Sequence, residues 1–90
     1  MGHEIIIEKK AGRNHHIVMQ DLSSPIARPY TAESNAGNST VGLQLHASLA
    51  NVLYRRGLRS CNISLRGKVD AEFLAAFKDA LIEKGVKITN

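Results

Sequence analysis

The sequence predicts a two-layer α/β sandwich in which an N-terminal β-hairpin is followed by a β-α-β-α-β unit, with two helices packed on one mixed sheet. Three observations lead to this fold class. Two short apolar runs rich in β-branched residues lie on either side of a Gly/Asn turn near the start of the chain. Two later segments repeat apolar residues at helical spacing. Each of those segments ends at a glycine that precedes another short apolar run.

Residues 1–20 are expected to form the hairpin. Isoleucine-containing strand segments flank a turn that includes Gly12 and Asn14, which is the pattern of two paired strands joined by a short loop. The expected hairpin therefore has a basic tip, formed by Lys9, Lys10 and Arg13.

The β-α-β-α-β core is expected over residues 26–89. Its first strand is assigned to residues 26–31, where Pro29 confines it to an edge or to a strand end, because proline has no N–H for the ladder. The segment 34–40 is rich in serine, asparagine and glycine, and this composition predicts a loop.

A helix is predicted after this loop, with Ser39 or Thr40 as its N-cap. Apolar residues recur at helical spacing over residues 41–53. Gly57 is expected to follow the C-cap in a left-handed conformation, which ends the helix.

The second half of the core follows the same logic. Residues 61–65 alternate as a half-buried strand does, and Gly67 is expected to end that strand. Asp70 is the predicted N-cap of the second helix, which ends near Gly85. A last strand is expected over residues 86–88.

Length and composition set limits on the class of protein. Ninety residues, 43% of them hydrophobic and 22% charged, are typical of one globular domain. A domain of this size buries only about 60–65% of the surface that its unfolded chain exposes, so a homodimer is an expected way to enlarge the core. The start of the chain lacks the pattern of a signal peptide, and no apolar run is long enough for a membrane span. We therefore expect a cytoplasmic protein with no membrane partner.

The charge distribution is uneven along the chain. No Asp or Glu lies between Glu33 and Asp70, and this interval carries much of the positive charge of a chain whose formal net charge is +4. A local excess of this kind points to an anionic partner, because charges act over about a Debye length, ~8–10 Å. The bases in the interval are Arg55, Arg56, Arg59, Arg66 and Lys68.

A helix ending in glycine, a strand ending in Arg66-Gly67-Lys68 and then a second helix resemble the centre of Alba-type domains. The stage V sporulation protein S group and the C-terminal domain of translation initiation factor 3 share that architecture. The resemblance covers residues 26–89 and implies a dimeric, largely sequence-independent binder of DNA or RNA, with Arg66 and Lys68 against phosphate. Alba proteins carry lysines in the loop before the first helix, whereas residues 34–40 contain none. They also have a long β-hairpin arm, for which the basic N-terminal hairpin is the available substitute.

No catalytic or metal-binding pattern accompanies these bases. His15 and His16 are adjacent, so on a strand they face opposite sides and cannot share an ion, and surface positions are expected for the histidines. Residues 37–40 lack the ending of a Walker loop and predict a capped helix start. Cys61, the one cysteine, excludes an internal disulfide and is expected to be a small buried hydrophobe. A third alternative is a small enzyme or carrier that uses His46 or Cys61, although neither residue has a possible catalytic partner at a characteristic spacing.

The sequence therefore predicts a small non-enzymatic protein, without cofactor or metal, that binds DNA or RNA through a basic surface. The alternative is a protein-interaction or regulatory module, such as an adaptor or an inhibitor of a larger complex. The same bases could instead compensate helix dipoles as solvated helix ends. Arg55 and Arg56 point in different directions around a helix, so convergence of the bases on one face decides between these interpretations. The predicted binding residues are Arg55, Arg56, Arg59, Arg66 and Lys68, with Lys9, Lys10 and Arg13 on the hairpin.

Overall fold

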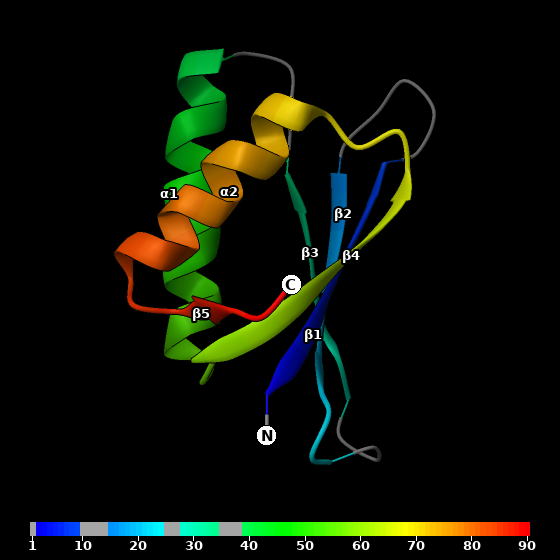
Figure 1. The fold of residues 1–90 in the computed structure, drawn as a ribbon. Helices are drawn as coiled ribbons and strands as arrows, with labels where there is room; N and C mark the ends of the chain where they lie inside the picture. The colour runs from blue at the N-terminus through cyan, green and yellow to red at the C-terminus, as the bar shows by residue number, and fades with distance from the viewer. Residues whose placement is uncertain (1, 10–14, 25–27, 35–38) are drawn as a thin grey trace.

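The computed structural model describes residues 2–9, 15–24, 28–34 and 39–90 (Figure 1). In chain order its elements are β1 (His3–Lys9), β2 (His15–Asp21), β3 (Tyr30–Ser34), α1 (Ser39–Arg55), β4 (Ser60–Gly67), α2 (Ala71–Glu83) and β5 (Lys87–Ile88). Within the described part of the chain, neither helix is long and apolar enough to cross a membrane.

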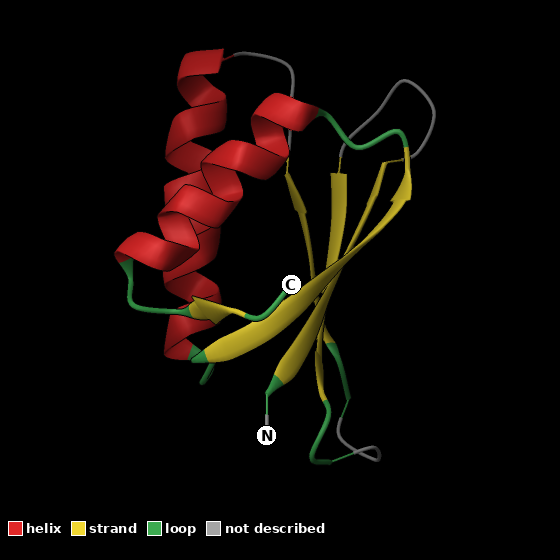
Figure 2. Cartoon of the chain, in the orientation of Figure 1, coloured by secondary structure: helices red, strands yellow, loops and turns green. Residues whose placement is uncertain are grey.

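One five-stranded mixed sheet holds the strands in the order β3-β2-β1-β4-β5. The first three strands form an antiparallel meander, and β4 runs parallel to both β1 and β5. Both helices cover the same face of this sheet and pack against each other (Figure 2). The predicted two-layer α/β sandwich, with a hairpin before a β-α-β-α-β unit, is confirmed.

The core lies between the sheet and the two helices. Alternate residues of the central strands point toward the helices, so the apolar members of each strand are buried and the intervening residues face the other way. The buried apolar residues from the sheet are Ile5, Ile7, Ile17, Met19, Cys61 and Ile63. Those from the helices and their ends are Leu49, Ala50, Leu53, Leu58, Phe73, Phe77, Leu81 and Val86. Full burial of each large side chain contributes about 1.5–3 kcal/mol.

Both helices end in a Schellman motif. At the end of α1, the N–H of Leu58 donates to the carbonyl of Leu53 at 3.1 Å, and the N–H of Gly57 donates to the carbonyl of Tyr54 at 3.0 Å. Gly57 has φ 102°, which a side-chain-bearing residue rarely adopts. Gly85 ends α2 in the same way. These bonds turn the chain sharply from each helix into the next strand.

Two strand boundaries differ from the expected ones. β3 starts at Tyr30, directly after Pro29, and runs to Ser34, because its residues pair with His15–Met19 of β2. Residues 25–27, the middle of which was expected to begin this strand, lie outside the described residues. β4 begins at Ser60, one residue before the expected alternation, because Ser60 pairs with Lys87 of β5, and it ends at Gly67 as predicted. Polar residues in these segments interrupt the apolar pattern typical of a strand, but pairing with a neighbouring strand stabilises the extended backbone there.

Candidate nucleic-acid interface

The five bases of the central interval lie at two ends of the same strand. Arg55, Arg56 and Arg59 surround the junction of α1 with β4, and this group is called the α1 end below. Arg66 and Lys68 flank Gly67, where β4 finishes, and this group is called the α2 end (Figure 1). At about 3.3 Å per residue, β4 places the two groups roughly 20 Å apart. The structure brings the first three together and sets the other two apart from them.

At the α1 end, Arg59 is bound to the chain itself. Its Nη1 donates hydrogen bonds to the carbonyls of Tyr54 at 2.7 Å and Leu58 at 2.9 Å. Its guanidinium carbon lies 3.8 Å from the centre of the Tyr54 ring. Carbonyls at a helix C-terminus carry partial negative charge, so a cation here stabilises α1. Arg59 therefore has a structural role in addition to any binding role.

The other two arginines of this end differ from each other. The guanidinium carbon of Arg56 lies 3.9 Å from the centre of the Tyr30 ring, which joins the end of α1 to the start of β3. Arg55 is exposed in the last turn of α1, and its side chain has no hydrogen bond or ion pair with the described part of the chain. The α1 end thus presents three exposed guanidinium groups, two of them held over tyrosine rings.

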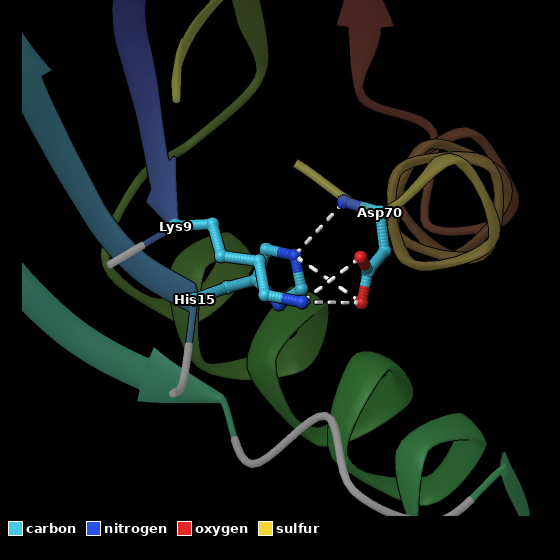
Figure 3. Close-up of polar contacts among 3 residues, drawn as sticks. All are labelled: Lys9, His15 and Asp70. Atoms are coloured by element: carbon cyan, nitrogen blue, oxygen red, sulfur yellow. Dashed lines mark hydrogen bonds and ion pairs between the residues drawn. The ribbon is translucent and has the colours of Figure 1, made fainter. Parts of the chain in front are cut away.

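Near the α2 end, three polar residues meet, one from β1, one from β2 and one at the N-cap of α2 (Figure 3). Lys9 Nζ lies 2.9 Å from Asp70 Oδ1 and 3.0 Å from Oδ2. The backbone N–H of Asp70 donates to His15 Nε2 at 3.1 Å, and this nitrogen lies 3.9 Å from Asp70 Oδ2. The cluster ties the ends of β1 and β2 to the start of α2.

Asp70 occupies the predicted N-cap position but does not cap the helix through its side chain. Its backbone is extended, with φ −66° and ψ 130°, as an N-cap residue requires, yet its carboxylate makes no hydrogen bond to the first turn. The carboxylate binds Lys9 instead. The predicted side-chain cap is therefore wrong, because a cation from β1 competes for the same oxygens.

The expectation of a surface histidine is wrong at His15. The ring is completely buried and stacks on Phe73, with 4.1 Å between ring centres and 5° between ring planes. His15 shares the helix-facing side of β2 with the apolar residues that alternate with it, while His16 lies on the opposite face. Because Nε2 accepts the Asp70 N–H, the neutral ring carries its proton on Nδ1.

The Lys9 ammonium controls the titration of Asp70. Its hydrogen bond lowers the pKa of the carboxyl group below its ordinary value, and the nearby charge of Lys9 acts in the same direction. Partial desolvation opposes them. The carboxylate is thus the favoured form in the folded protein.

These contacts determine which predicted hairpin bases are available. Lys9 is engaged by Asp70, with only 24% of its side chain exposed. Lys10 and Arg13 lie outside the described residues. Arg66 and Lys68 are exposed, and no hydrogen bond or ion pair joins their side chains to the residues that the structure describes.

Sequence reasoning missed the two tyrosines of the α1 end. Tyr30 and Tyr54 have no assigned role in the predicted interface, whereas in the structure each lies under an arginine. A partial signal exists, since Tyr54 lies in the last turn of α1 and Arg59 follows just after the helix-ending glycine. A guanidinium held over a ring still directs N–H donors outward, in the fork geometry that suits a phosphate.

No protein-family model matches the chain, and no curated protein matches it. Among the residues described, no three His, Cys, Asp or Glu side chains lie close enough together to hold a metal ion.

Proposed function

We propose that this protein binds the phosphate backbone of DNA or RNA through the α1 end. The observation that carries the proposal is the gathering of Arg55, Arg56 and Arg59 around one helix terminus, with two of the guanidinium groups held over tyrosine rings. Holding these side chains in place before binding reduces the conformational entropy that phosphate contact would cost. Arginine is also the cation best suited to charge-assisted, two-pronged hydrogen bonding with phosphate oxygens.

The mechanism is neutralisation of phosphates with release of condensed counterions. Both hydrogen bonds from Arg59 to the chain use Nη1, which leaves Nη2 as a donor for phosphate. Each phosphate contact adds about −0.9 to the slope of log K against log salt for duplex DNA, so three contacts correspond to a slope of about −2 to −3. Binding of this kind is insensitive to base sequence, because no base edge is read.

The resemblance to Alba-type domains assigns phosphate contact to Arg66 and Lys68 as well. Because β4 separates these residues from the α1 end, we expect them to contribute independently of it. The proposal includes the homodimer, which would bring two α1 ends to one nucleic acid. Sedimentation at several protein concentrations tests that part.

Fluorescence-anisotropy titration of labelled duplex DNA and single-stranded RNA, at about 50 and 200 mM salt, tests the binding. Arg55→Ala/Arg56→Ala should weaken binding and reduce the salt slope by about 2. The matched control is Lys78→Ala/Lys84→Ala, which removes one base from α2 and one from its C-cap. Absence of binding at the lower salt concentration, or equal losses in both double variants, would overturn the proposal.

One observation favours a second candidate function, the protein-interaction module. Beyond Cys61, the side of β4 that faces away from β1 has no neighbouring strand among the described residues, and this stretch carries an exposed leucine, Leu65. Such an edge is a place where a partner's strand can pair. The backbone pairing and the charges along this edge indicate the chemical class of its partner.

A further inference from the structure

The outer edge of β4 is only partly paired. The carbonyl of Arg59 accepts the N–H of Lys87 at 2.9 Å, and the carbonyl of Cys61 accepts the N–H of Thr89 at 2.9 Å. Backbone groups of alternate residues in a strand point to the same side. The odd-numbered residues of β4 therefore direct their N–H and C=O groups away from β1, toward the outer edge.

The side chain of Asn90 extends this pairing by one position. Its Oδ1 accepts the N–H of Ile63 at 2.8 Å, and its Nδ2 donates to the carbonyl of Ile63 at 2.7 Å. The amide thus imitates the backbone of a neighbouring strand. The next outward-pointing residue is Leu65, and no residue in the described part of the chain pairs with it on this side.

The same stretch stands out by its exposure. Leu65 lies in register with the buried Cys61 and Ile63, yet it is 49% exposed. Arg66 and Gly67 are exposed as well. Gly67 has φ 75°, and a Cβ there would lie 2.8 Å from the carbonyl oxygen of Lys9, so the strand end sits tightly against β1. The three residues form a fixed sheet edge with free backbone groups and one apolar side chain, called the open edge below.

A row that alternates acidic and basic residues crosses the uncovered face of the sheet and ends at the open edge. Register places Glu33 opposite His16, His16 opposite Glu8, and Glu8 opposite Arg66. His16 Nδ1 lies 3.6 Å from Glu33 Oε1. Opposite charges directly across a strand pair stabilise a sheet, and like charges destabilise it. The next strand in this row should therefore present an acidic side chain to Arg66.

We propose that the open edge binds an extended acidic peptide segment of a partner protein by strand addition. The segment's backbone pairs with the N–H and C=O of Leu65 and continues the sheet. An acidic side chain lies opposite Arg66 on the uncovered face, within reach of Lys68 just beyond the strand. An apolar side chain beside it packs on Leu65, on the helix side. The motif is thus an alternation of apolar and acidic residues.

Charge complementarity favours this occupant over a second copy of the chain. An antiparallel pair of two β4 strands centred on Leu65 would place Ser64 of one copy opposite Arg66 of the other. The two Arg66 side chains would then be diagonal neighbours, about 7–8 Å apart, without an acid between them. A nucleic acid fits less well still, because it offers neither a β-backbone nor an apolar partner for Leu65.

The test uses short labelled peptides that alternate valine with glutamate. Anisotropy should detect binding to the full chain with a Kd at or below about 1 mM. Amide chemical-shift changes should centre on Leu65–Lys68. Two matched peptides separate the contributions: lysine in place of glutamate reverses the charge, and alternate N-methylation blocks backbone pairing while the charge is kept. Both should bind at least about tenfold more weakly.

Variants of the protein locate the site. Leu65→Pro removes one outward N–H while leaving the ladder to β1 intact, since proline is tolerated where the missing donor faces solvent. Arg66→Glu reverses the charge opposite the expected acid, and Leu65→Ser removes the apolar contact. Their matched controls are Arg28→Glu and Ile82→Ser, at exposed positions of the same residue types elsewhere. Each edge variant should lower affinity about tenfold, and each control should leave it unchanged.

Three results would overturn the proposal. The first is no binding of the valine–glutamate peptide, with the edge variants folded as judged by circular dichroism. The second is equal binding of the N-methylated peptide, which would mean ionic attraction without strand addition. The third is broadening of the Leu65–Lys68 signals by the protein itself in a concentration-dependent way, or by RNA, which would assign the edge to a second copy or to nucleic acid.

Discussion

The two ends of β4 carry similar basic side chains but hold them in different ways. At the Ser60 end, β5 covers the strand edge, Arg59 binds carbonyls at the end of α1, and Arg56 lies over Tyr30. At the Gly67 end, no described strand covers the edge, and Arg66 has no polar partner among the described residues. Whether a cation near a strand already has a partner within the protein is therefore more informative about binding than the number of such cations.

Replacement of the glycine at each end of β4 is expected to give the largest difference in the free energy of unfolding between the two ends. Gly67→Ala should lower the free energy of unfolding by about 2–4 kcal/mol, because it adds a backbone clash to the strain of a positive φ. Gly57→Ala, where nothing lies within 4 Å of the added Cβ, should cost about 1 kcal/mol. Urea unfolding of both variants measures the difference. Equal losses would mean that the close contact with Lys9 does not constrain the Gly67 end.

An intermediate effect is expected from removal of one arginine at each end. Arg59→Ala should reduce the free energy of unfolding by about 1 kcal/mol, because it removes a hydrogen bond to the Tyr54 carbonyl in the last turn of α1 and another to the Leu58 carbonyl just beyond the helix. Arg66→Ala should change it by less than about 0.5 kcal/mol. The measurement is again urea unfolding at constant pH. If Arg66→Ala lowered the free energy of unfolding more than Arg59→Ala, the arginine on the uncovered face of the sheet would matter more for stability than the arginine at the end of α1.

The smallest effect is expected from the Lys9–Asp70 ion pair near the Gly67 end, through the stability of the protein in acid, since a partly exposed ion pair is screened by solvent. The pKa of Asp70 is lowered in the folded state, chiefly by its hydrogen bond with Lys9, so the carboxylate stabilises the fold above its unfolded pKa. That stability is lost as the pH falls through the lower, folded pKa.

Thermal unfolding between neutral pH and the acid range should therefore show a shallower decline for Asp70→Asn than for the unmodified chain. Asp79→Asn, on the exposed side of the same helix, is the control and should follow the unmodified chain. Parallel curves for all three proteins would argue against a role for Lys9 in acid stability.

Local patterns were enough to predict the order of elements. The hairpin and both helices follow from short-range periodicity and from glycines with positive φ, which is why they were predicted within a few residues. The division of the bases was also predictable in principle, since a strand between Arg59 and Arg66 must separate them.

Contacts between distant parts of the sequence were not predictable in this way. The Lys9–Asp70 pair joins residues 61 positions apart, and it depends on parallel pairing of β1 with β4, which no local pattern encodes. The burial of His15 had a signal, because it alternates with two buried residues of β2. Position in that alternation, and not the polar character of the side chain, determines its burial.

The buried cysteine makes the covered end of β4 observable by chemical labelling. Cys61 is 2% exposed, burial raises the pKa of its thiol, and its carbonyl holds Thr89 beyond β5. The thiolate is the nucleophile that attacks a thiol reagent, and the reagent must reach the sulfur, so modification must wait for the protein to open around this residue. Because the chain has a single cysteine, the labelling rate at a reagent concentration high enough to outpace reclosing gives the frequency of that opening, without an engineered probe.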